Sequence, residues 1–143
     1  MIFWRRERIT RANDDDYLDR TVIFECRWFS IRLHKFVASD DSTLHDHPFN
    51  FVSFILRGGY TEYVGHGWSR TWDGSWRFQG VKGTRYSPGS VLFRRGEHAH
   101  RVELAPGRPA WTLVFTGPRR REWGFFTRQG WICHDKYDSA VHG

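Results

Sequence analysis

The alternation of apolar and polar residues predicts a chain built mainly from β-strands. Residues 21–38, TVIFECRWFSIRLHKFVA, are rich in β-branched and aromatic side chains and alternate well enough to form one long strand or two consecutive strands. Further strands are predicted at 90–94, 100–104, 110–115 and 123–127, because glycine or proline bounds each apolar run. No segment after residue 20 has sustained 3.6-residue periodicity. The pattern therefore favours an all-β sandwich or barrel, of which the jelly roll is one form.

A pair of glycines predicts a tight hairpin in the middle of the chain. Gly58-Gly59 lies between two β-forming segments and supplies the positive φ values that such a turn requires. Pairing across this turn would place Glu62 opposite Ile55, about 26 Å along the strand from His47 at ~3.3 Å per residue. Direct metal ligation by Glu62 would then need a sharply bent strand, and a pairing of this carboxylate with one of the many arginines is favoured.

Two other polar stretches predict a turn and a loop. Asp73-Gly74 predicts a second hairpin, in which Trp72 and Trp76 cover the same surface. The residues 11–20, RANDDDYLDR, predict a surface loop between a short basic N-terminus and the first apolar stretch.

Length and composition limit the classes of protein. The chain has 143 residues, which predicts one domain over 1–143 with a single core. It has no run near the ~18 consecutive apolar residues of a membrane span, and its first residues lack the features of a signal peptide. We therefore expect a cytoplasmic protein without a membrane partner. The two cysteines, Cys26 and Cys133, have no CxxC spacing and are expected to be reduced thiols.

The charge balance favours an anionic partner. The formal net charge is +6, and 19 of the 22 cationic residues are arginine, which binds carboxylates and phosphates through a planar fork. The alternative is that these arginines pack on aromatic rings and pair with the 16 acidic residues. The composition does not separate the two.

Two His-x-His pairs carry the chemistry that the sequence suggests. His45 and His47 flank Asp46 at the entrance to an apolar strand, and His98 and His100 lie about fifty residues later. Side chains two apart in an extended chain point the same way, so one pair can bind one metal ion while Asp46 points to the other face. A single pair is more often a set of loop histidines, but two pairs at strand edges favour a metal site. Three neutral imidazoles with open positions would suit Fe, Zn, Cu or Ni in a catalytic site.

On these residues the sequence resembles a small cupin. The first cupin motif is matched by HDHPFNFVSFILRGG from His45 to Gly59, and the second by SPGSVLFRRGEHAHRV, with His100 at the ligand position. The resemblance covers roughly residues 28–116 and implies a double-stranded β-helix, or jelly-roll, barrel. Residues 1–20 would then form a basic N-terminal segment and loop, and 117–143 a C-terminal strand and tail. The HDHP, GGYTEY, TGP and REWGF blocks also resemble small cupin-like proteins of phages and bacteria, a likeness that implies no reaction.

The chain departs from the cupin pattern at the carboxylate ligand. Phe51 or Val52 stands where the family usually has glutamate, and neither can bind a metal ion. The resemblance therefore implies a three-histidine site of His45, His47 and His100, similar to that of thiol dioxygenases and some diketone-cleaving cupins. Arg95 replaces the usual proline of the second motif and the terminal Asn is missing, which leaves His98 as an alternative to His100.

Other residues are candidates for the pocket. Arg32 and His34 share a strand face and could line the same cavity, with Glu62 as a further candidate catalytic residue; the alternative for His34 is a half-exposed strand histidine. The run 119–121, three arginines, could receive an anionic substrate, although such a run is more often a solvated loop.

These observations lead to two hypotheses from different classes. The first is a mononuclear metal-binding cupin, with Fe(II) as the first choice and Zn, Ni or Mn as alternatives, that acts as a dioxygenase-type enzyme on a small anionic or chelating substrate. A metal-assisted isomerase or hydrolase is a variant of it. The second is a non-catalytic jelly-roll module that binds a sugar, a nucleotide or nucleic acid through arginine and tryptophan. Exposed sheet edges are compatible with a homodimer.

Overall fold

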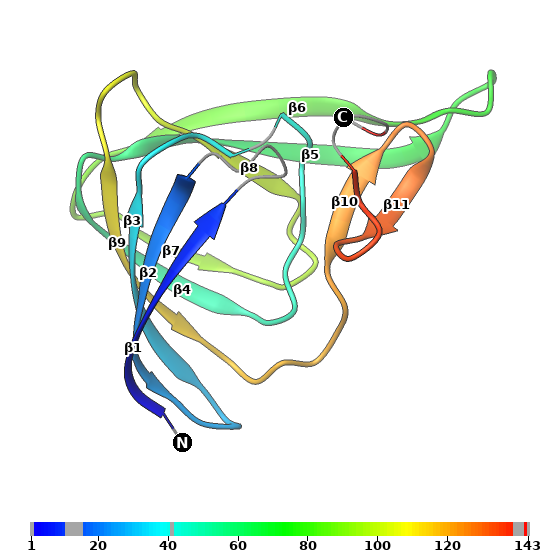
Figure 1. The fold of residues 1–143 in the computed structure, drawn as a ribbon. Helices are drawn as coiled ribbons and strands as arrows, with labels where there is room; N and C mark the ends of the chain where they lie inside the picture. The colour runs from blue at the N-terminus through cyan, green and yellow to red at the C-terminus, as the bar shows by residue number, and fades with distance from the viewer. Residues whose placement is uncertain (1, 11–15, 41, 139–141, 143) are drawn as a thin grey trace.

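The computed structural model describes residues 2–10, 16–40, 42–138 and 142, and its secondary structure elements are β-strands (Figure 1). The strands are β1 (Ile2–Thr10), β2 (Asp16–Glu25), β3 (Ser30–Phe36), β4 (Phe51–Arg57), β5 (Tyr60–Arg70), β6 (Trp76–Tyr86), β7 (Val91–Arg94), β8 (His100–Glu103), β9 (Ala110–Thr116), β10 (Gly124–Thr127) and β11 (Gly130–Cys133). No described residues form a helix with the length and apolar character needed to cross a membrane.

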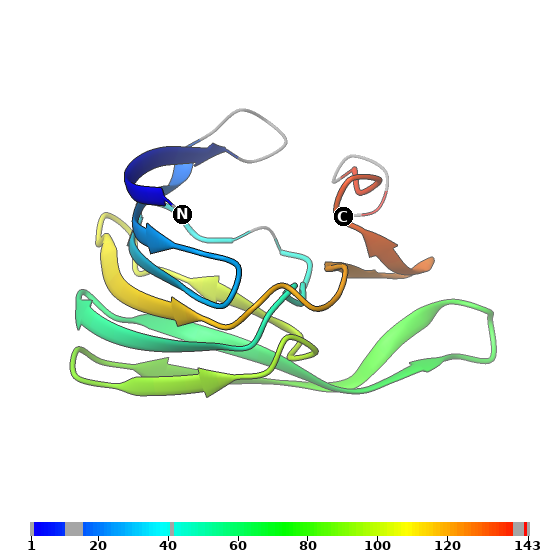
Figure 2. The ribbon, with the colours of Figure 1, turned by 90° about the horizontal axis from the view of Figure 1, so that it is seen from below.

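The strands form two facing layers, as an all-β jelly roll requires. One layer is a six-stranded antiparallel sheet in the order β1-β2-β3-β9-β4-β7. The other contains the sheet β6-β5-β8 and the hairpin β10-β11, and His45 joins them because it forms isolated bridges with both His100 and Phe125. The long β5–β6 hairpin extends past the end of the six-stranded sheet (Figure 2). The predicted fold class is confirmed.

Most predicted strands are present. The apolar stretch 21–38 contains the end of β2 and all of β3, paired as an antiparallel hairpin, and the four short strands appear as β7, β8, β9 and β10. The C-terminal part has a second strand, β11, that the pattern did not predict.

The N-terminal loop prediction is wrong for residues 16–20, which belong to β2; residues 11–15 lie outside the described residues. The segment before them is also a strand, β1, and it pairs with β2 along most of its length. Opposite charges face each other in this pairing, with Glu7 opposite Arg20 and Arg8 opposite Asp19. Cross-strand ion pairs stabilise a ladder that has little apolar alternation, so the hydrophobic pattern does not reveal it.

The hairpin predicted at Gly58-Gly59 is wrong. β4 pairs with β7 and β9, whereas β5 pairs with β6 and β8, so the two glycines carry the chain from one layer to the other. Both have positive φ, 84° and 79°, and a Cβ on Gly58 would lie 2.2 Å from the carbonyl oxygen of Pro109. Glycine is required at position 58 because the backbone passes so close to the Pro109 carbonyl oxygen. Glu62 is therefore not paired with Ile55, and the distance of Glu62 from the histidines deduced from that pairing does not apply.

The hairpin at Asp73-Gly74 is confirmed, since β5 and β6 pair up to Arg70 opposite Trp76. The expected partnership of Trp72 with Trp76 is wrong. Trp72 lies in the turn, outside the ladder, and is 98% exposed, while Trp76 stacks on Trp68 with ring centroids 5.8 Å apart.

The apolar core fills only one end of the space between the layers. It is built from Ile55, Tyr60, Leu92, Val102 and Ala110, with partly buried residues packed around them. The inward positions elsewhere on β2, β3 and β9 include arginine, histidine and threonine, so the interior continues from this core into a cavity lined by both polar and apolar side chains.

Candidate metal centre

The backbone places His45 directly beside His100. The amide of His45 donates to the carbonyl oxygen of His100 at 2.9 Å, and the amide of His100 donates to the carbonyl oxygen of His45 at 3.0 Å. Directly opposed residues of an antiparallel pair present their side chains on the same face. The two imidazole rings accordingly have centroids 5.1 Å apart.

His47 joins the same face two residues later. Its amide donates to the carbonyl oxygen of Gly96 at 2.8 Å, and its own carbonyl oxygen accepts from the Arg121 guanidinium at 2.8 Å. The Nε2 atoms of His47 and His100 are 3.1 Å apart. One ring nitrogen from each of the three histidines falls within 4.8 Å of the others, so the structure brings together the predicted triad of His45, His47 and His100.

Asp46 lies on the opposite face from these histidines, as the alternation predicts. Its side chain is 2% exposed and accepts hydrogen bonds from the Gly124 amide at 2.7 Å and from the Trp131 indole at 3.1 Å. It also forms an ion pair with Arg121 at 3.0 Å. The segment that carries the histidines is thereby attached to the β10–β11 hairpin.

Glu62 contacts the triad through the Nδ1 side of the His100 ring. Its carboxylate is 1% exposed and pairs with Arg94 through contacts of 2.7 and 3.1 Å, which confirms the predicted pairing with an arginine. The same carboxylate lies 2.6 Å from Nδ1 of His100 and 3.3 Å from Nε2 of His98. Burial alone would raise the pKa of Glu62, but the hydrogen bonds from His100, His98 and Arg94 outweigh it and hold the pKa well below its usual range.

The Glu62 carboxylate also fixes the tautomer of His100. An ionised carboxylate only accepts, so Nδ1 of His100 must carry the proton that it shares with Glu62. In the neutral imidazole the lone pair is then on Nε2, which faces His47. A carboxylate behind a histidine in this arrangement is typical of metal-ligating imidazoles.

His98 belongs to a different cluster from the triad. His98 groups with Glu62 and His100. The group that contains His45 and His47 includes His100 but not His98. The geometry therefore favours His100 over His98 as the third ligand.

The electrostatics of His47 also suit a cation. Its Nδ1 is buried without a hydrogen-bond partner in the described part of the chain. Burial, followed by the neighbouring His100, His45 and His98, lowers the pKa of His47 well below the usual value, while Glu62 opposes this shift. A neutral His47 beside a His100 lone pair is a donor set that fits a divalent metal ion.

The triad opens into a cavity of about 600 Å³ between the two layers. Arg32 and His34 of β3 line it, as predicted. Phe51, one of the two residues predicted for the usual carboxylate position, also lines it and packs on His47 with ring centroids 4.7 Å apart, so it supplies a wall and no ligand.

Arg20 is a cavity residue that the sequence reasoning missed. It is the cross-strand partner of His34 on β2, and its Nε donates to Nε2 of His34 at 3.3 Å. The sequence pattern assigned residue 20 to a surface loop, so Arg20 was not predicted to line the cavity. Desolvation in the wall, together with Arg20 and Arg32, lowers the pKa of His34 well below its usual value. His34 is a half-buried residue of β3 that also lines the cavity, so both readings of it hold.

Arg32 has a buried donor without a partner. Its Nη2 lies 3.4 Å from Glu25, but its Nε is buried and has no hydrogen-bond partner among the described residues, and neither has Oγ1 of Thr112. Both residues line the cavity. Burial and the charge of Arg20 lower the pKa of Arg32 from its usual value, whereas Glu25 and Glu7 oppose this shift. An anion in the cavity would satisfy the unpaired donor and offset this unfavourable charge burial.

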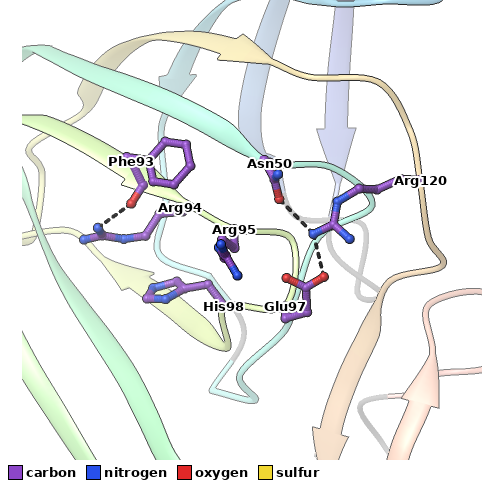
Figure 3. A pocket seen from close by; sticks show the side chains of 7 residues that line it. All are labelled: Asn50, Phe93, Arg94, Arg95, Glu97, His98 and Arg120. Carbon is purple, nitrogen blue, oxygen red and sulfur yellow. Dashed lines mark hydrogen bonds and ion pairs between the residues drawn. The ribbon is translucent and has the colours of Figure 1, made fainter.

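A second hollow of about 880 Å³ is bordered by Arg94 and His98, two side chains that contact Glu62 (Figure 3). Its lining residues are Asn50, Phe93, Arg94, Arg95, Glu97, His98 and Arg120. The run 119–121 is not a free cationic cluster, because these arginines pair with Glu122, Glu97 and Asp46 in turn.

The comparisons with known proteins agree on the fold. No protein-family model matches the sequence, and no curated protein matches it. A cupin 2 conserved barrel domain protein from Rhodopseudomonas palustris superposes with a TM-score of 0.64 at 15% identity, over 89% of this chain and 80% of that one. A cupin-2 domain protein from Rhodospirillum rubrum gives 0.60 at 14% identity, over 84% and 73%. The structure of Fe(II) HppE gives 0.59 at 15% identity, over 81% of this chain but only 60% of that one.

Proposed function

We propose that this chain, which has the cupin fold, binds one divalent metal ion through His45, His47 and His100 and acts on a small anionic substrate in the adjoining cavity. The observation that carries the proposal is the convergence of three imidazole nitrogens within 4.8 Å, one of them oriented by a buried carboxylate. Fe(II) is the proposed ion, because Fe(II) HppE shares the fold and neutral imidazole suits iron. Zn, Ni and Mn are the alternatives to be tested.

The protein side of the reaction follows from the cavity wall. Arg32 and Arg20 would bind the anionic end of the substrate, with the unpartnered Nε of Arg32 as the first donor. His34, held neutral, would accept a hydrogen bond or position the substrate beside Arg20. Phe51 and Trp123 would cover the apolar part of the substrate and exclude water.

A divalent ion held by three neutral ligands would retain its full charge and open positions for a chelating substrate and for dioxygen. Glu62 would keep the proton on Nδ1 of His100, so that Nε2 stays available as a ligand. It would act as a positioning residue, since it touches His100 and does not line the cavity.

The first experiment measures metal content and binding. Protein purified without added metal is analysed for bound elements and then titrated with Fe(II) under anaerobic conditions, as wild type and as the double variant His45→Ala/His47→Ala. We expect the double variant to bind one equivalent of metal fewer than the wild type. The matched control is His66→Ala, because His66 is an exposed histidine of β5 outside the triad.

The second experiment separates the reaction classes. Oxygen uptake with a panel of small carboxylates and phosphonates, abolished by chelator and restored by Fe(II), supports the dioxygenase proposal. Turnover of such a compound without oxygen would support an isomerase or hydrolase at the same site. An equal number of Fe(II) equivalents bound by the double variant and by the wild type would overturn the proposal.

A further inference from the structure

A second group of metal-ligating side chains lies at the rim of the cavity. Glu122 stands just before β10, Cys133 is the last residue of β11, and His134 follows it. The Sγ of Cys133 and the Nε2 of His134 each lie 3.8 Å from the same carboxylate oxygen of Glu122. The three ligand atoms all fall within 4.8 Å of one another.

The hairpin register places these residues together. Gly124 pairs with Cys133, and the amide of His134 donates to the carbonyl oxygen of Trp123 at 3.0 Å, so the two strand ends remain in register past the last ladder pair. The His134 ring stacks on Trp123 with centroids 4.7 Å apart and an interplanar angle of 0°. Packing and backbone hydrogen bonds therefore fix the imidazole beside Glu122 before any ligand binds.

The separations match those of a zinc site. Zinc binds thiolate at about 2.3 Å, imidazole at about 2.0–2.1 Å and a carboxylate oxygen at about 2.0–2.2 Å, so at a tetrahedral angle the carboxylate oxygen lies about 3.4–3.6 Å from each of the other two ligand atoms. The observed separations of 3.8 Å would need only a small adjustment of an exposed Glu122 side chain. Asp135, hydrogen-bonded to Cys133, adds a second carboxylate to the surroundings and makes them more favourable to a cation.

We propose that Glu122, Cys133 and His134 form a second metal site, suited to zinc and similar borderline cations, which joins the two ends of the β10–β11 hairpin. The Cys133 thiol would release its proton to solvent as sulfur binds the ion. The site would stiffen one wall of the cavity, because Trp123 and His134 both line it. It uses none of the three triad histidines, so it stands independently of the function proposed above.

The test is a titration of the reduced, full-length protein with Co²⁺ alone, followed by absorption spectroscopy. A thiolate ligand gives a sulfur-to-metal charge-transfer band in the near ultraviolet, which an all-imidazole site does not give. We expect this band in the wild type and its complete loss in Cys133→Ser. Cys26→Ser is the matched control, since Cys26 is the other free, half-buried cysteine of the chain, and it should retain the band.

Further variants make the result specific. His134→Ala should weaken Co²⁺ binding by about tenfold or more, judged by the same band. Zn²⁺ should raise the melting temperature of the wild type by mass action, and Cys133→Ser should lose the part of this rise that belongs to the site.

Two results would overturn the proposal. One is the absence of a charge-transfer band in the wild type, and the other is a band that persists in Cys133→Ser. The double variant His45→Ala/His47→Ala separates the two proposals, because it should lose the triad's equivalent of metal and keep the band. Loss of the band in the double variant, with Cys26→Ser unaffected, would likewise contradict an independent site.

Discussion

Replacement of Glu62 by glutamine tests the link between the buried ion pair and the metal centre. Glutamine keeps the shape of the side chain but removes the charge that pairs with Arg94 and accepts from His100. Removing one partner of a buried ion pair costs about 3–5 kcal/mol, because the other charge stays uncompensated. Arg94 is 17% exposed, so water can partly solvate it, and the lower end, about 3 kcal/mol, is expected here.

The same change should weaken metal binding. With glutamine at position 62 either tautomer of His100 can find a partner, so Nε2 no longer faces His47 with its lone pair in every molecule. Loss of such a supporting carboxylate typically costs about 10–100-fold in metal affinity. The two effects are separable. The unfolding free energy of metal-free protein measures the loss of the ion pair, and Fe(II) titration measures the loss of metal affinity.

The pH dependence has a definite sign. The pKa of Glu62 is lowered in the folded protein, so the stability it contributes is present above its unfolded pKa of about 4.5 and is lost as the pH falls below that value. Urea unfolding of the metal-free wild type should therefore show a steeper loss of stability in acid than Glu62→Gln does.

Glu103→Gln is the matched control for this experiment. Its partner Arg101 lies at 3.2 Å, but the Glu103 side chain is 47% exposed, and exposed pairs contribute only about 0–1 kcal/mol. We expect little change in unfolding free energy or metal affinity. Equal behaviour of Glu62→Gln and Glu103→Gln in both assays would refute the reasoning.

Two further predictions concern the anchor of the histidine segment and the cavity wall. Asp46→Ala removes the acceptor for Gly124 and Trp131 and the counter-charge of Arg121. We therefore expect the free energy of unfolding in urea to fall by about 3 kcal/mol and the tryptophan emission to change. An unchanged unfolding midpoint would show that these contacts are not needed for stability. His34 has a pKa held well below its usual value, so the unfolded chain binds a proton that the folded one does not, and stability should fall below about pH 6.5 by up to about 1.4 kcal/mol per pH unit. His34→Gln should flatten this slope in metal-free protein, and equal slopes in the two proteins would contradict the assignment.

The sequence was informative wherever local chemistry decides the structure. The strands β7, β8 and β9 and the hairpin at Asp73-Gly74 follow from alternation and from glycine at a position of positive φ. The face shared by His45 and His47, with Asp46 on the other side, follows from the two-residue period of an extended chain. These features depend on neighbours in the sequence, and a pattern of residue types can record them.

The strands β1 and early β2 show where such patterns stop. They are held by cross-strand pairs such as Glu7 with Arg20. These two residues face each other although they are 13 positions apart in the sequence. The hydrophobic alternation is interrupted because Arg20, which lines the cavity, lies between the buried Leu18 and Val22. Arg20 was missed as a cavity residue for this reason.

The residue pattern alone is enough to predict the all-β class, most strand positions and the residue types of the candidate metal centre. The pairing of the strands became known only from the fold, in which β4 and β5 lie in different layers although a local turn rule predicted a hairpin. That choice brings Glu62 to within 2.6 Å of His100, whereas a flat hairpin would have kept it far from the triad. The physical reason is that the pairing of distant strands depends on the total burial and hydrogen bonding of both layers, which no short segment contains.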